Sequence, residues 1–163
     1  MDCRNKHKFM IKKIFKALAA AILVLCSCEK APSVITEDSP AFSGTMTVAY
    51  EGESFEQKNI KVLAEFNEDK TALDIKLQKV KFVPAMPVSI DVTIMDIPVV
   101  QESDGTWSFH GDGITPWAMG GPYDTYRVDD LSGRLGSSGL EFSLGFFNTK
   151  KHENYPTSYS GQI

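Results

Sequence analysis

The sequence has few of the residues on which small catalytic and metal sites depend. Its 163 residues include three cysteines and three histidines. Cys3, Cys26 and Cys28 all lie near the N-terminus, so residues after position 28 can form no disulfide, no cysteine-based zinc site and no cysteine nucleophile. Only His110 and His152 remain beyond that point, which are too few ligands for a usual zinc site. We therefore expect neither a metal nor a cofactor.

Basic residues are also scarce outside one segment. Six of the 17 lysines and arginines lie in the first 16 residues, whereas the chain after position 27 holds eleven basic and twenty acidic residues. That part of the chain therefore carries a net charge of −9. Nucleic acids bind to clustered lysine and arginine. The sequence thus disfavours DNA and RNA as partners.

Helical periodicity and catalytic motifs are missing as well. No stretch after position 40 repeats its apolar residues with the period of an α-helix. The Gly-x-Ser-x-Gly nucleophile elbow is absent, and no helical pattern follows Gly111–Gly113, as a phosphate-binding loop would require. Asp129 and Asp130 are adjacent in a predicted strand, where neighbouring side chains point to opposite faces. We expect a protein that is not an enzyme.

The N-terminal segment has the pattern of a secretory signal. A lysine-rich stretch precedes Ala17–Cys26, a run of ten uncharged residues. Such a run is too short for a membrane-spanning helix, which needs about 20 residues, but it suits the apolar middle of a signal peptide. Leu25 lies three positions before Cys28, and the small residue Ser27 lies directly before it. This pattern predicts a lipoprotein signal peptide over residues 1–27, cleaved between Ser27 and Cys28.

Cys28 is therefore the predicted lipid attachment site. Its sulfur would carry diacylglycerol, and its amine would carry a further acyl chain such as palmitate, which together give stable anchoring. Residues 28–40 then comprise the lipidated cysteine and a flexible tether, since this segment is rich in proline and acidic residues. The prediction is a lipid-anchored protein of the cell envelope. Glu29 after the cysteine favours the outer membrane, and the side of that membrane stays open.

From position 41 onward, apolar residues recur at every second position, which is the period of a β-strand. In the first such segment, for example, Phe42, Met46 and Val48 share one face. The pattern predicts strands near residues 42–50, 59–66, 73–82, 88–99, 107–109, 126–135, 140–146 and 157–163.

The alternation is interrupted at a few positions. It changes phase before Val80 and again before Ile97, and Leu63 breaks it within residues 59–66. A slip of one residue is what a β-bulge produces, and barrels use bulges to bend their strands. We expect bulges before Val80 and before Ile97.

Eight consecutive strands with mostly tight links favour an all-β fold over residues 41–163, an antiparallel up-and-down barrel of eight strands. A two-sheet sandwich is the alternative, and it needs longer crossovers than most of these links allow. The large aliphatic side chains should face the interior. Charged residues such as Lys61, Glu65 and Asp74 should then face water, which is the reverse of a membrane-spanning barrel.

Four stretches carry a family resemblance: FSGTMTVAY at 42–50, residues 56–66, PAMPVSIDVTIMDIPVV at 84–100, and Tyr-Ser-Gly at 159–161. Together they resemble the calycin-like β-barrel domain found in secreted lipoproteins of Gram-negative gut anaerobes. The resemblance covers about residues 41–163. It implies a lipocalin-like eight-stranded barrel and implies no activity.

A set of aromatic residues with one arginine gathers around the long connection at residues 115–124. A long loop with aromatic residues at a barrel mouth is suited to act as a lid or a ligand contact, and an inward arginine could hold an acidic head group. The alternative is that the tryptophans plug the barrel and that the arginine pairs with Asp129 or Asp130. The candidate ligand-binding residues are Trp107, Trp117, Tyr123, Tyr126 and Arg127.

Two functions fit these observations. The first is a lipid-anchored envelope barrel that binds a small apolar or amphipathic molecule without catalysis. The second is a non-enzymatic interaction module of the envelope, with a filled barrel core and a protein partner whose identity the sequence does not indicate.

Overall fold

The computed structural model describes residues 33–163. The predicted signal peptide and the predicted lipidation site Cys28 lie outside the described residues. The described part consists of β-strands, turns and loops, and none of its elements is a helix long and apolar enough to cross a membrane. Its strands are β1 (Ala41–Tyr50), β2 (Glu53–Phe66), β3 (Ala72–Val80), β4 (Ile90–Gln101), β5 (Trp107–Gly111), β6 (Trp117–Ala118), β7 (Gly121–Pro122), β8 (Tyr126–Leu135), β9 (Gly139–Asn148) and β10 (Glu153–Gln162).

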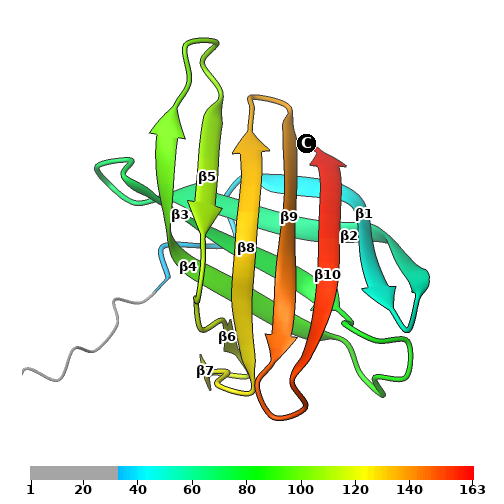
Figure 1. Cartoon of the computed structure of the whole chain (residues 1–163). Coiled ribbons are helices and arrows are strands. Elements are labelled where there is room, and N and C mark those ends of the chain that lie inside the picture. The colour runs from blue at the N-terminus through cyan, green and yellow to red at the C-terminus, as the bar shows by residue number, and fades with distance from the viewer. Residues whose placement is uncertain (1–32) are drawn as a thin grey trace, which may run out of the picture. The chain divides into compact units, whose positions relative to one another are not determined.

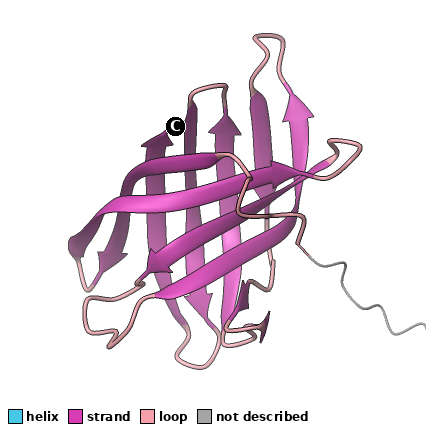
Figure 2. Ribbon diagram, turned by 180° about the vertical axis from the view of Figure 1, so that it is seen from behind, coloured by secondary structure: helices cyan, strands magenta, loops and turns pink. Residues whose placement is uncertain are grey.

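Eight of these strands form a closed antiparallel barrel (Figure 1). They pair in the chain order β1-β2-β3-β4-β5-β8-β9-β10, and β10 pairs with β1 to close the cylinder. Figures 1 and 2 show β5, β8, β9 and β10 on one side and β1 to β4 crossing behind them. The predicted up-and-down barrel is confirmed. The alternative sandwich is excluded, because its two sheets would not be joined along both edges.

The predicted strands coincide with the barrel strands, but two of them begin earlier than the pattern indicates. β2 begins at Glu53 rather than near residue 59, and β10 begins at Glu153 rather than at residue 157. The added residues are mostly exposed, and backbone pairing with β1 and β9 holds them in the sheet. Alternation therefore marks only the part of a strand that covers the core.

The barrel strands bend at bulges. Pairing registers shift in β2, β3, β4 and β8. A non-glycine residue with φ between 51° and 58° lies at each shift: Asn59, Lys79, Asp96 and Asp130. The bulges in β3 and β4 are those predicted from the phase changes before Val80 and Ile97. The other two leave no clear mark in the alternation.

Aspartates hold three of these bulges in place. A bulge leaves an N–H group without its ladder partner, and an unpaired N–H that is removed from water is costly. In each of the three cases a carboxylate accepts that N–H at 2.9–3.1 Å. The pairs are Asp91 with Lys79, Asp74 with Asp96, and Asp112 with Asp130.

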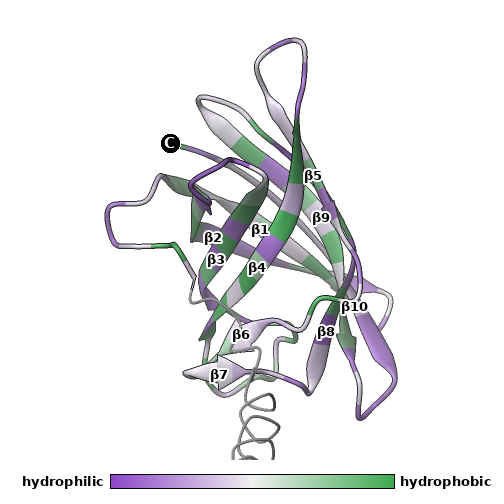
Figure 3. Ribbon diagram, turned by 90° about the vertical axis from the view of Figure 1, so that its left-hand side faces the viewer, coloured by the Kyte–Doolittle hydropathy of each residue, from purple (hydrophilic) through white to green (hydrophobic). Residues whose placement is uncertain are grey.

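The interior of the barrel is filled with apolar side chains. Phe42, Phe82, Phe109 and Phe146 are each at most 1% exposed. The rings of Phe82, which follows β3, and Phe146 in β9 have centroids 4.0 Å apart, so side chains from facing strands meet across the interior. Figure 3 shows hydrophobic and hydrophilic residues alternating along the strands. The predicted inward orientation of the aliphatic residues is confirmed.

Asp74 departs from the prediction that it faces water. Its side chain points to the outer wall, yet the residue is only 6% exposed. The carboxylate accepts the N–H groups of Val34 at 3.1 Å and of Asp96 at 2.9 Å. Residues 33–40, the described part of the predicted tether, lie across this wall in Figure 2. The prediction was wrong because the covering residue is 40 positions away in the sequence.

The long connection between β5 and β8 contains a small hairpin that completes the barrel wall. β6 pairs with β4 at Val92 and Thr93, and β7 pairs only with β6. Met119 and Gly120 at the hairpin tip both have positive φ, 52° and 85°, as in a type I′ turn. The segment predicted as a loop therefore forms a short hairpin that pairs with β4 through β6, and Ile114 before the hairpin forms a single bridge with Val128 in β8.

Candidate functional site

The structure divides the predicted ligand-binding residues among three places. Trp107 begins β5 and pairs with Leu135 at the last residue of β8, whereas Tyr126 is the first residue of β8. Trp107 and Tyr126 thus lie at opposite ends of the barrel (Figure 1). Trp117 and Tyr123 lie with Tyr126 at the end that holds the β6–β7 hairpin. Arg127 is on the outer wall.

The end with the hairpin is plugged by aromatic rings. The ring of Tyr126 lies 5.3 Å from Tyr123, 5.4 Å from Phe82 and 6.4 Å from Tyr155, measured between centroids. The Tyr155 hydroxyl donates a hydrogen bond to Glu153 at 2.6 Å. Burial, together with this carboxylate, raises the pKa of Tyr155 well above its usual range. These packed rings close this end of the interior.

Arg127 is held on the outside of the barrel. Its Nε and one terminal nitrogen donate to both carboxylate oxygens of Asp129 at 2.6 Å. The guanidinium also lies 5.0 Å from the ring centroid of Phe147. The hydrogen bonds from Arg127 lower the pKa of the Asp129 carboxyl. An inward Arg127 that holds an acidic head group inside the barrel does not occur here, and the alternative pairing with Asp129 does.

The opposite end of the barrel has an apolar mouth. A pocket of about 310 Å³ opens there, lined by Phe66, Trp107, Leu135 and Ile163 among others. The rings of Phe66 and Trp107 have centroids 4.9 Å apart. Both side chains are half-buried, and Glu65 is the one acidic side chain in the lining. This is the candidate site, because it offers aromatic surface to solvent at an entrance to the core.

Of the residues that line this mouth, only Trp107 was predicted from the sequence to bind a ligand. Phe66 ends β2, Leu135 ends β8, and Ile163 is the last residue of the chain. Barrel closure brings these residues together from distant parts of the sequence. The alternation marks Phe66 and Leu135 as apolar strand residues but does not show that they meet.

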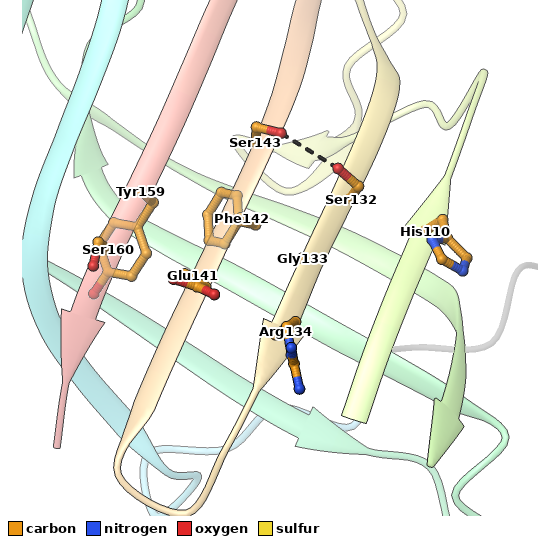
Figure 4. Close-up of a pocket in the computed structure, with 9 residues that line it drawn as sticks. All are labelled: His110, Ser132, Gly133, Arg134, Glu141, Phe142, Ser143, Tyr159 and Ser160. Carbon is orange, nitrogen blue, oxygen red and sulfur yellow. Dashed lines mark hydrogen bonds between the residues drawn. The ribbon is translucent and has the colours of Figure 1, made fainter. Parts of the chain in front are cut away.

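A second depression lies on the outer face of β5, β8, β9 and β10 (Figure 4). Its volume is about 480 Å³, and its side chains are mainly polar. Ser132 and Ser143 lie 3.3 Å apart, hydroxyl to hydroxyl, while Arg134 donates to Asp104 and Thr106, each at 2.9 Å. In this part of the structure neither serine is hydrogen-bonded to His110, which lines the same depression. The arrangement does not form a nucleophile and base.

Metal-ligating side chains are scattered over residues 33–163. Within that range, no three histidine, cysteine, aspartate or glutamate side chains lie where they could share a metal ion. His110 is exposed, and the ring of His152 lies 6.3 Å from that of Phe147.

Comparison with known proteins supports the fold. The sequence matches no protein-family profile and no curated protein. Among solved structures it is similar to the crystal structure of a "putative outer membrane protein" from Bacteroides fragilis NCTC 9343, with a TM-score of 0.59 and 15% sequence identity. The match covers 77% of this chain and 51% of that chain, so this chain spans about half the length of that neighbour. At this identity the likeness shows the barrel fold alone, and the calycin-like resemblance stays a prediction.

Proposed function

We propose that this protein is a lipid-anchored, non-catalytic barrel of the cell envelope that binds a small apolar or amphipathic molecule at its open mouth. The observation that carries the proposal is the pocket of about 310 Å³ beside Phe66 and Trp107. Small-molecule sites are typically concave and lined by aromatic and apolar side chains with a few polar groups. Glu65 at the rim suits a ligand whose polar end donates hydrogen bonds.

The envelope location rests on two independent supports. The Leu25–Cys28 pattern after a basic and apolar leader is that of a lipidated secretory protein. The Bacteroides fragilis neighbour, described in the words quoted above, shares the barrel fold. We therefore propose a location at the outer membrane, with lipid on Cys28 as the anchor.

Displacement of an environment-sensitive apolar dye tests the ligand proposal. We expect Trp107→Ala to weaken dye binding about tenfold, since an aromatic contact contributes about 0.5–1.5 kcal/mol beyond its buried area and 1.4 kcal/mol is tenfold in affinity. Trp117→Ala, at the other end of the barrel, is the matched control and should bind the dye normally. Equal binding by both variants, or no binding by the wild type, contradicts the proposal.

Substitution of the lipidated cysteine tests the anchor. Cells that express Cys28→Ala should accumulate uncleaved precursor without radiolabelled palmitate, because the acyl chains attach at that residue. The wild type should incorporate the label and remain with the membrane fraction. Label that survives in Cys28→Ala would refute the assigned cleavage site.

A second candidate function is an interaction module, and the filled interior favours it. Phe42, Phe82, Phe109 and Phe146 occupy the interior, so a ligand could not enter deeply without displacing them. Crosslinking in intact cells followed by pull-down separates the two functions, because only the interaction module predicts a stable protein partner. The dye experiment and the crosslinking experiment can fail independently.

A further inference from the structure

The apolar mouth has an acidic side chain in its lining and no basic one. Glu65 lines the pocket, and neither a lysine nor an arginine does. Glu65 lies opposite Asp74 in the pairing of β2 with β3. Asp74 accepts the N–H groups of Val34 and Asp96, whereas none of the ion pairs within residues 33–163 includes Glu65. Like charges opposite each other in a sheet are unfavourable, so a bound cation at Glu65 would relieve this repulsion.

The turns around the mouth add to its negative charge. The strand ends and turns at this end of the barrel, residues 65–71, 102–107 and 134–139, hold five acidic and two basic residues, a net charge of −3. The acidic residues are Glu65, Glu68, Asp69, Glu102 and Asp104, and the basic ones are Lys70 and Arg134. Arg134 already donates to Asp104 at 2.9 Å. Hydrogen bonds from the Thr71 and Thr106 hydroxyls lower the pKa values of the Asp69 and Asp104 carboxyls.

Phe66 and Trp107 supply aromatic faces beside this acidic rim. Both residues line the pocket, with ring centroids 4.9 Å apart and ring planes inclined at 53°, so neither ring covers the other's face completely. Both are half-buried and keep part of their surface toward solvent. The face of an aromatic ring is electron-rich, and tryptophan attracts a cation more strongly than the other aromatic residues do. Aromatic side chains recognise quaternary ammonium groups in this way.

We infer that the ligand of the mouth is cationic, an organic ammonium compound whose charged group lies between Glu65 and the ring of Trp107. This inference rests on the proposed function and adds the charge of the ligand. The apolar part of the ligand packs on Phe66 and Leu135, because Phe42 and other buried side chains fill the interior below. An anionic amphiphile would meet no basic side chain in this lining. The net charge of −9 after position 27 also favours the approach of a cation.

Competition between two ligands of opposite charge tests the inference. Benzyltrimethylammonium and benzylsulfonate carry the same apolar group, and each is titrated against the apolar dye bound to the full-length protein. The same maltoside detergent is present in every titration, so competition from the detergent is equal. We expect the ammonium compound to bind about five- to tenfold more tightly, since a cation–π contact and an exposed ion pair each change affinity by a factor of a few.

Two substitutions locate the charged group. Glu65→Gln should reduce the preference for the ammonium compound about threefold, because it removes the acidic partner. Trp107→Leu keeps an apolar side chain, removes the aromatic face and should reduce the same preference. Glu51→Gln is the matched control, since it removes one negative charge in the β1–β2 turn at the opposite end of the barrel. We expect this control to keep the full preference.

The outcomes separate this inference from the proposed function. Equal binding of the two ligands, or tighter binding of the sulfonate, overturns the cationic ligand and leaves the mouth as a binding site, provided that the wild type binds the dye. A preference that Glu51→Gln reduces as much as Glu65→Gln arises from the net charge of the domain and overturns the contact at Glu65. A wild type that binds no dye overturns the proposed function and this inference with it.

Discussion

At the scale of single residues, Asp74 makes two long-range contacts with one carboxylate. It accepts an N–H from the docked N-terminal segment, residues 33–40, and an N–H from the β4 bulge. Removal of a hydrogen-bonding partner leaves buried groups without water and costs more than the net contribution of the bond itself. Substitution of Asp74 should therefore lower the stability of the folded protein, although charged residues on an outer wall can usually be replaced with little loss of stability.

We expect Asp74→Ala to lower the free energy of unfolding by about 1–3 kcal/mol, because two N–H groups lose their acceptor. Asp74→Asn, which keeps one carbonyl oxygen, should be less destabilising. Urea denaturation followed by circular dichroism measures both. The control is the exposed residue Glu141, whose replacement by alanine should change stability by no more than about 0.5 kcal/mol. An Asp74→Ala variant as stable as this control would show that the carboxylate does not hold the segment.

Tyr159 predicts how stability depends on high pH. Its hydroxyl donates to the carbonyl oxygens of Phe42 at 2.9 Å and Ile60 at 3.3 Å, and burial raises its pKa from 10.0 to about 12. The neutral phenol therefore stabilises the folded state fully below pH 10, and this contribution is lost as the pH rises toward about 12. Denaturant titrations between these pH values should show a loss of about 2–3 kcal/mol from this group.

Tyr159→Phe is the matched variant for that measurement. It keeps the ring that stacks on Phe142 and removes the titrating hydroxyl. We expect it to be about 1 kcal/mol less stable at neutral pH, through the lost hydrogen bonds, and to show a smaller decline between pH 10 and 12. An unchanged alkaline decline would assign that decline to other groups.

At the scale of elements, the bulges decide which residues face inward. Each one restores the inward phase of its strand after an added residue. Their non-glycine residues adopt a left-handed backbone that glycine adopts at less cost. The strain at these positions is thus the local cost of curving the wall.

Lys79→Gly should stabilise the protein by about 1 kcal/mol, because glycine relieves the positive φ of 55° at this bulge. Lys61→Gly, in a regular part of β2, removes the same charge and should destabilise by about 0.5–1 kcal/mol. Thermal unfolding of the two variants side by side measures the difference. A decrease in stability for both would contradict the role assigned to the backbone at Lys79.

The elements could be predicted from the sequence where they cover the core, and less well elsewhere. Phase changes before Val80 and Ile97 identified two bulges because both sides of each slip are apolar. Polar strand ends such as residues 53–58 show no alternation of apolar and polar residues. Leu63 interrupts the alternation in β2 because the docked segment covers the outer wall beside it, so an apolar residue can face outward there. Of the mouth residues, Trp107 was found and Ile163 was not, since closure of the barrel is a property of pairing between distant strands.

At the scale of the whole molecule, closure depends on the contact between the first and last strands. β1 pairs with β10 from Ser43 and Gln162 to Val48 and Thr157. No disulfide can replace this seam, since residues 33–163 contain no cysteine. The barrel is therefore closed by backbone pairing and core packing.

Deletion of residues 157–163 should abolish cooperative unfolding, because it removes the strand that joins β9 to β1 and exposes the core. Near-ultraviolet circular dichroism and binding of an apolar dye would report the loss of fixed packing. Deletion of Ile163 alone is the control, since this residue lies beyond the last strand and is 74% exposed. A cooperative transition in the longer deletion would show that the remaining strands close without β10.

The short β6–β7 hairpin sets where local opening of the folded barrel begins. Its ladder contacts with β4 are limited to Trp117 and Ala118, far fewer than the neighbouring strands share. Sub-global opening begins where the fewest backbone bonds must break. Amide hydrogens in β6 and in the facing part of β4 should consequently exchange faster than those in β9. Water should reach the phenylalanine side chains of the interior first at this hairpin, while the other strands of the barrel remain paired.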